Sequence, residues 1–282
     1  MTKIRNIKQL VNGIKASDGD GVQLTRIIGS PYLDMLDPFL LLDAFGSDKP
    51  QDYIGGFPSH PHRGFETVTY MLAGKMRHKD SAGNEGVIEA GGVQWMTAGK
   101  GIIHSEMPEQ DNGLLAGFQL WVNLPASDKM TEPKYQEKTA SEIPEESRGE
   151  EIQIKVIAGK TQNGTEGVID NPKISPTYWD ISLSENSEFV DDIPEEHNAF
   201  VYLIEGGISI GNSSSKLAPG QLAVLDEGNA INIVANSDSR FLLIAGKPIG
   251  EPVERAGPFV MNTKQEIQQA FSDYQLGKLT GS

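Results

Sequence analysis

The segment FETVTYML at residues 65–72, which stops at Gly74, decides the fold class. It is rich in β-branched and aromatic side chains, which pack well on a pleated sheet. Similar short runs follow at residues 87–90, 93–96 and 118–124, and each ends at Gly or Pro. Short strands separated by such turns at near-regular intervals predict an all-β protein built as an antiparallel sandwich or barrel.

Strand patterns resume in the second half of the chain, with runs at residues 152–157, 178–183, 199–204, 221–225 and 241–245. The two halves resemble each other. YMLAG at 70–74 matches YLIEG at 202–206, an offset of 132 residues, and the segment 88–102 matches 217–231 at an offset of 129. We interpret this as an internal duplication in which one copy has a shorter loop.

The composition changes between the two copies, where the chain becomes charged and loses its periodicity. This predicts an N-terminal domain at 1–130, a linker at 131–150 with one short helical turn, and a C-terminal domain at 151–282.

The tail has a helical period. Its apolar residues at i, i+3, i+4 and i+7 are Ile267, Ala270, Phe271 and Tyr274. Thr263 with Glu266 forms a capping-box start, and Gly277 marks a stop. We therefore expect one short C-terminal helix at about 263–277, with its apolar stripe buried.

Composition excludes several functions. The chain of 282 residues has no cysteine, so disulfides, thiolate metal sites and cysteine nucleophiles are excluded. A net charge of −15 argues against a broad phosphate-binding surface and hence against a direct nucleic-acid partner. The sequence shows no signal-peptide pattern and no apolar run of about 18 residues that would span a membrane. These observations favour a cytoplasmic protein.

Three of the five histidines belong to one constellation. His60 and His62 are separated by one residue just before a strand, and His104 and Glu106 are spaced in the same way after a Gly-rich turn. Residues i and i+2 of an extended chain point to the same face, so two neighbouring strands can bring four donors to one point. Three imidazoles and one carboxylate suit Fe, Mn, Co, Ni, Cu or Zn, and leave two positions open on an octahedral ion.

The remaining histidines and the second copy provide comparisons. His78 lies in a polar segment and His197 follows two glutamates, so both are expected to be exposed. The offsets place Asp192, Pro194, Ile233 and Ala235 where the first copy has its four donors. The sequence therefore predicts one metal site, with the C-terminal domain structural or devoted to closure and binding.

Several segments resemble a known family. HPHRGFETVTY, VQWMTAGKGIIHSEMPE, FQLWVNLP and ERAGPFVMNTKQEIQQAFSDY are similar to pirin segments, and the two histidine motifs resemble those of the cupin superfamily. The resemblance covers nearly the whole chain. It implies two tandem cupin β-barrels of the jelly-roll type (a bicupin) and an iron-type metal, most simply Fe(II), held by His60, His62, His104 and Glu106.

The resemblance implies two classes of function. One is an oxidoreductase similar to quercetin 2,3-dioxygenase, which cleaves a flavonol or a similar small aromatic substrate with dioxygen. Glu106 would then be the catalytic base, with Glu66 as an alternative base or as a hydrogen-bond partner of a ligand. The other is a non-enzymatic, redox-responsive iron protein that acts through a protein partner.

We favour the dioxygenase. A zinc- or nickel-bound protein without turnover is a third interpretation, because ligand type alone does not select the metal. The candidate apolar walls for an aromatic ligand are Phe57, Met96, Phe118 and Trp121, although a place in the core is the more ordinary interpretation of each. Since the duplication supplies an internal partner, a monomer is expected.

Overall fold

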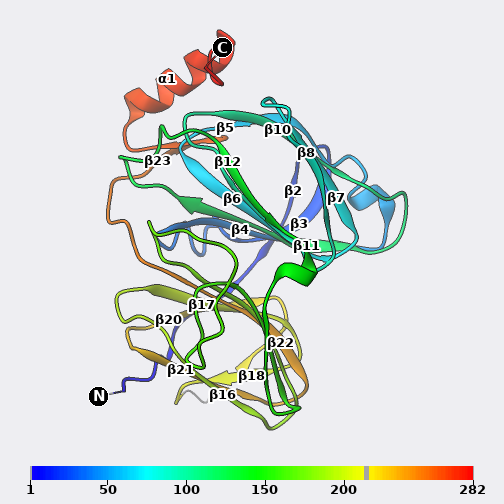
Figure 1. Cartoon of the computed structure of the whole chain (residues 1–282), viewed down its shortest axis with the longest axis vertical. Helices are drawn as coiled ribbons and strands as arrows, with labels where there is room; N and C mark the ends of the chain where they lie inside the picture. Colours follow the sequence, from blue (N-terminus) through cyan, green and yellow to red (C-terminus); the bar gives the residue numbers. More distant parts are fainter. Residues whose placement is uncertain (1, 213–215, 282) are drawn as a thin grey trace. The chain divides into compact units, whose positions relative to one another are not determined.

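The computed structural model describes residues 2–212 and 216–281, and it confirms the all-β prediction (Figure 1). Its one α-helix, α1, spans Lys264–Gln275. The described chain forms two compact units. The N-terminal unit contains Ile14–Gly29, Phe39–Ala140 and the chain from Ile249, and the C-terminal unit contains the chain up to Gly13, Ser30–Pro38 and Ser141–Pro248.

Two antiparallel sheets build the N-terminal unit. The larger has the order β12 (Lys134–Lys138), β9 (Val93–Thr97), β6 (Phe65–Ala73), β11 (Leu115–Asn123), β4 (Phe39–Ser47), β3 (Val22–Ile28) and β2 (Ile14–Asp18). The smaller has the order β5 (Phe57–His62), β10 (Ile102–Pro108), β7 (Lys75–Asp80) and β8 (Glu85–Glu89). A separate pair, β23 (Glu254–Ala256) and β24 (Phe259–Met261), comes from the end of the chain.

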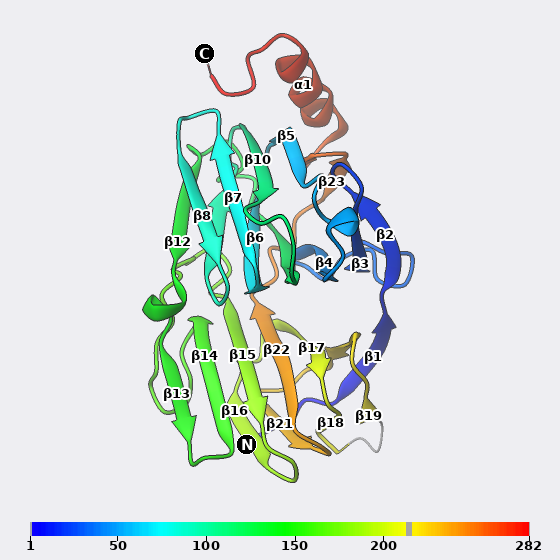
Figure 2. The same ribbon diagram turned by 90° about the vertical axis from the view of Figure 1, so that its right-hand side faces the viewer.

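The C-terminal unit repeats this arrangement, and part of its larger sheet is visible in Figure 2. The larger sheet has the order β1 (Ile7–Asn12), β20 (Gln221–Leu225), β17 (Asn198–Glu205), β22 (Ser239–Gly246), β15 (Thr177–Leu183), β14 (Ile152–Ala158) and β13 (Glu145–Arg148). The smaller has the order β16 (Glu188–Asp192), β21 (Ala230–Ala235), β18 (Ile208–Ile210) and β19 (Lys216–Leu217). The identical strand order supports the internal duplication.

The compact units differ from the predicted, continuous domains. β1 forms the edge of the C-terminal unit beside β20, in the place that β12 takes beside β9. The predicted linker at 131–150 contains the edge strands β12 and β13, joined through one 3₁₀ turn at Ala140–Glu142. Charged residues are common on edge strands because one side faces water. Their charge hides the strand period in the sequence.

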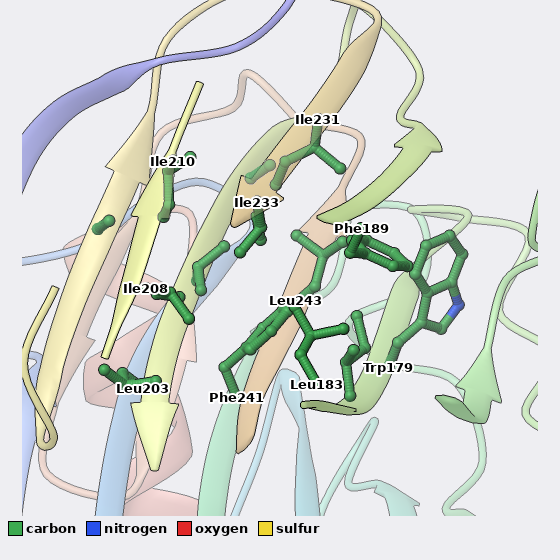
Figure 3. Packing of buried hydrophobic residues seen from close by; sticks show 14 of the residues in the cluster. Trp179, Leu183, Phe189, Leu203, Ile208, Ile210, Ile231, Ile233, Phe241 and Leu243 are labelled. Carbon is green, nitrogen blue, oxygen red and sulfur yellow. The ribbon is translucent and has the colours of Figure 1, made fainter. Parts of the chain in front are cut away.

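The core of the C-terminal unit fills the space that its sheets enclose. Trp179, Phe189 and Phe241 are fully buried there, as Figure 3 shows. Ile233 and Ala235, the residues that the sequence offsets align with His104 and Glu106, belong to the same cluster. Apolar packing therefore takes the place of metal donors in this unit.

The C-terminal helix begins as predicted. Thr263 Oγ1 accepts a hydrogen bond of 3.2 Å from the Glu266 amide, and Glu266 Oε2 accepts one of 3.1 Å from the Asn262 amide. Ile267 and Ala270 are buried against β24, whereas Phe271 and Tyr274, the other half of the predicted stripe, are 37% and 41% exposed. Among the described residues, no helix is long and apolar enough to cross a membrane.

A buried lysine joins the end of the chain to the N-terminal unit. Lys129 is 1% exposed, and its Nζ donates to the carbonyls of Gly64 (2.7 Å) and Val260 (3.1 Å) and to Asn123 Oδ1 (2.7 Å). Burial lowers the pKa of Lys129 to about 8 because removal from water disfavours the charged ammonium. The amine is thus held on three oxygens at a desolvation cost.

This cost predicts a pH dependence. Between pH ~8 and ~10.5 the unfolded chain keeps the Lys129 proton that the folded chain has released, so the free energy of unfolding rises with pH by up to about 3 kcal/mol. Lys129→Met should lack this rise. The measurement is urea unfolding of both proteins near pH 7 and near pH 10, compared as differences so that other titrating groups cancel. The same rise in the free energy of unfolding from pH 7 to pH 10 in both proteins would contradict the prediction.

Candidate metal centre

The predicted histidines lie on two neighbouring strands. β5 and β10 pair antiparallel, with Ile102 opposite His62 and His104 opposite His60. The register then shifts, so that Glu106 lies opposite Phe57. Since alternate residues share a face, the pairing brings the three imidazoles together from adjacent strands.

The three imidazoles form a compact cluster. One nitrogen from each of His60, His62 and His104 lies within 4.8 Å of the others. The Nε2 atoms of His60 and His62 are 3.0 Å apart, and the three ring centroids are separated by 4.5 to 5.0 Å. This spacing suits three nitrogens that share one ion.

The protonation of these rings favours a cation between them. His60 Nδ1 lies 2.8 Å from the Pro58 carbonyl, which can only accept, so Nδ1 carries a hydrogen and Nε2 is the nitrogen that faces His62. Burial lowers the pKa of His62 and of His104 well below the ordinary histidine range, so both rings are neutral near pH 7. Neutral imidazole is the form that ligates metals.

His104 gives the clearest test of fit. It is 1% exposed, and within the described part of the chain neither of its ring nitrogens has a hydrogen-bond partner. A buried polar group without a partner costs about 1–3 kcal/mol. A transition-metal ion would satisfy a nitrogen of this ring together with His60 and His62, so the donor set fits such an ion.

Glu106 lies beside the cluster and is itself hydrogen-bonded. It is 4% exposed, and Thr69 Oγ1 lies 2.9 Å from its Oε1 and 2.7 Å from Gln119 Oε1. Burial raises the pKa of Glu106 above that of an exposed glutamate. Among the described residues the set of donors within mutual reach contains the three imidazoles, and the carboxylate is outside it.

Glu66, the alternative base, points at different partners. Its Oε2 accepts a 2.9 Å hydrogen bond from Trp95 Nε1, and its Oε1 accepts one of 2.7 Å from Thr97 Oγ1. Both donors lie on β9, which pairs with the strand that carries Glu66. These bonds give Glu66 a role in holding two strands of the larger sheet together.

A pocket of about 680 Å³ opens onto the cluster. His60, His62 and Glu106 line it, and its apolar walls include Phe57 and Trp121. The other two candidate wall residues, Met96 and Phe118, are 0% and 2% exposed and belong to the core. Trp121 also packs against His62, with ring centroids 5.4 Å apart, so the aromatic wall reaches the cluster.

The charged residues that line this pocket were not predicted from the sequence. Arg26 on β3 forms a double hydrogen bond with Asp43 on β4, at 3.0 Å and 2.7 Å. Arg255, from the end of the chain, lies 4.8 Å above the Trp121 ring. Strand pairing and a distant segment place these residues in the pocket, and neither leaves a local motif.

The expectations for the other two histidines are wrong. His78 is 4% exposed on β7, where Met76, His78 and Asp80 point inward between exposed Lys79 and half-buried Arg77. Its Nε2 lies 2.6 Å from Glu137 Oε2. A run of polar residues hid this alternation in the sequence.

His197 is also 4% exposed. Its carbonyl accepts a 2.8 Å hydrogen bond from Arg5 Nη2, and Arg5 belongs to the same unit although it lies at the other end of the sequence. The sequence neighbours Glu195 and Glu196 therefore gave a false indication of exposure.

The fold and the three-histidine site define a protein of the cupin class. Residues 21–122 match the Pirin family, and residues 178–280 match the Pirin C-terminal cupin domain. A pirin-like protein of Caulobacter vibrioides is 50% identical over 275 residues, which cover 98% of this chain and 99% of that protein. The chain belongs to the pirin family.

Solved structures agree with this assignment. A quercetin 2,3-dioxygenase from Acinetobacter baumannii superimposes with a TM-score of 0.91 and 36% identity over 99% of both chains. A bacterial pirin from Escherichia coli in complex with nickel(II) has a TM-score of 0.62 and 25% identity, and covers 88% of this chain and 99% of that one.

Proposed function

We propose that the protein is a metal-dependent dioxygenase that cleaves a flavonol or a similar aromatic substrate. The observation that carries the proposal is a pocket with aromatic walls that is lined by half-buried His60, buried His62 and the buried carboxylate of Glu106. Buried His104 completes the cluster of three imidazoles. The likeness to a structure described as a quercetin 2,3-dioxygenase supports the reaction class. A cytoplasmic, monomeric protein is part of the same proposal.

The ion would be held by His60, His62 and His104, with Glu106 as a fourth ligand. Imidazole and carboxylate donors suit Fe, Mn, Co, Ni, Cu and Zn, and we favour Fe(II) for a reaction with dioxygen. When bound, it would supply Lewis acidity toward the flavonol 3-hydroxyl and a template for dioxygen.

Glu106 would take the proton from the flavonol 3-hydroxyl. As a ligand of the ion, Glu106 would have to leave the ion in order to accept this proton, because ligation lowers the basicity of a carboxylate. Thr69 donates to one carboxylate oxygen and so orients the group. Because the Thr69 hydroxyl has a single hydrogen, the Gln119 amide would then present its NH₂ group to the Thr69 oxygen.

The pocket walls would orient the substrate. Phe57 and Trp121 offer apolar faces to an aromatic ring and exclude water from the buried donors. Arg255 covers the Trp121 ring, which holds this wall in one orientation. A flat substrate that enters along these residues would meet the imidazoles at the inner end of the pocket.

Aerobic turnover of quercetin tests the proposal. The protein is reconstituted with Fe(II) without oxygen, exposed to air with quercetin, and followed by flavonol loss and carbon monoxide release. We expect turnover by the wild type and none by His104→Ala or by the metal-free protein. Absence of turnover in wild type that holds Fe(II) tightly would contradict the enzyme and favour the redox-responsive regulator.

A further inference from the structure

The end of the chain lies directly against the strand that carries His60 and His62. The Val260 amide donates a 3.0 Å hydrogen bond to the Arg63 carbonyl, and the Arg63 amide donates one of 3.4 Å to the Pro258 carbonyl. The fit is close at the next residue, since a Cβ on Gly64 would lie 2.0 Å from the Val260 carbonyl oxygen. Residues 258–260 are thus seated on the chain immediately after the second histidine.

The Arg63 side chain extends this contact to two other segments. The side chain is 4% exposed, and its Nε donates to the Lys100 carbonyl. Its Nη1 donates to Asp273 Oδ2 at 2.6 Å, and its Nη2 donates to the Leu279 carbonyl at 3.3 Å. Lys100 belongs to the turn that leads into β10, the strand of His104. One guanidinium therefore ties the end of β5 to the start of β10 and to the C-terminal helix.

The helix also packs against the second ligand-bearing strand. Ile103, the residue before His104, joins a cluster with Phe259, Ile267 and Leu279. At Gly101 (φ +148°) a Cβ would lie 2.4 Å from the Leu279 carbonyl oxygen, so the turn before β10 needs glycine in order to meet the tail. Both strands that supply imidazoles are consequently held by residues near the end of the chain.

We propose that Arg63 is a positioning residue of the metal centre, and that the C-terminal segment 258–279 is the clamp through which it acts. The inference rests on the proposed metal site. Arg63 fixes the separation between β5 and β10, and hence the distance from His62 to His104. A planar guanidinium with five donors can bind three acceptors at once, which a lysine ammonium cannot reproduce in the same geometry.

The test measures metal binding rather than turnover. Metal-free wild type, Arg63→Gln, Arg63→Lys and Asp273→Asn are titrated with Co(II) against a chelator, well below their unfolding temperatures, and the visible Co(II) absorption is recorded. We expect Arg63→Gln to lose about 10- to 100-fold in affinity and to change the absorption spectrum, because residues that orient metal ligands have effects of this size. Arg63→Lys should recover only part of the loss, and Asp273→Asn should show a smaller loss in the same direction.

Arg148→Gln is the matched control. Arg148 pairs with Glu146 at 2.6 Å and with Asp191 in the C-terminal unit, so its loss should destabilise the fold but leave the Co(II) affinity and spectrum unchanged. Wild-type affinity and spectrum in folded Arg63→Gln would overturn the inference. If Arg63→Gln does not fold, wild-type values in Asp273→Asn would overturn it. Failure of the wild type to bind Co(II) would instead overturn the proposed metal site.

Discussion

His62→Ala is expected to lower the affinity for Co(II) or Fe(II) by more than about 100-fold, while the metal-free protein stays folded. The loss of an outer partner of a metal ligand already costs 10- to 100-fold, and His62 is proposed as a ligand itself. The fold should survive because the buried apolar cores of both units remain. The measurement is metal content after dialysis, with circular dichroism as the check on folding.

His197→Asn is the matched control for this variant. It also removes a buried imidazole, but in the C-terminal unit. We expect it to lower the free energy of unfolding and to keep full metal content, the opposite pattern to His62→Ala. Retention of a full equivalent of metal by His62→Ala would show that the ion binds elsewhere.

Glu106→Gln is expected to lower the turnover of quercetin by about 10²- to 10⁴-fold, the usual contribution of a general base. The amide keeps the size of the side chain and can still accept from Thr69, so the pocket keeps its shape. Any loss of metal affinity is separated by measuring turnover at saturating Fe(II) and dividing by the metal content.

Glu66→Gln separates the two candidate bases. This change weakens the acceptor for Trp95 and Thr97 and should cost about 1–3 kcal/mol of stability, with turnover per bound metal close to wild type. The reverse result, full turnover in Glu106→Gln and loss in Glu66→Gln, would assign the base to Glu66.

Much of the fold could be predicted from local patterns. Runs of β-branched and aromatic residues gave the strands, and the Thr263–Glu266 capping box gave the start of the helix. The two i, i+2 pairs correctly indicated that His60, His62 and His104 meet. Glu106 keeps the alternation and is buried on the same face of β10 as His104. Its carboxylate nevertheless accepts from Thr69 and lies outside the set of mutually close donors, which the spacing alone could not show. Its role as a ligand stays a prediction.

Features that depend on distant partners escaped the sequence. β1 forms an edge of the larger sheet in the C-terminal unit, and β12 forms the equivalent edge in the N-terminal unit. No local pattern in the sequence predicts which of the two sheets an edge strand will join. His78 contacts Glu137 and the His197 carbonyl accepts from Arg5, and both partners lie far away along the chain. Polar neighbours in the sequence predict that a histidine is exposed only if no residue from a distant segment contacts it.

The late position of the clamp has a consequence for biosynthesis. A chain folds from its N-terminus while it emerges from the ribosome. All three imidazoles emerge long before Asp273 and Leu279, the residues that fasten Arg63. The nascent protein therefore displays its histidines on strands that are not yet fastened, and under the proposed clamp the site reaches its final geometry only after residues 258–279 have emerged. A chain that stops before residue 258 would carry every proposed donor but lack the proposed clamp, so we expect it to hold metal more weakly than the chain that contains residues 258–279.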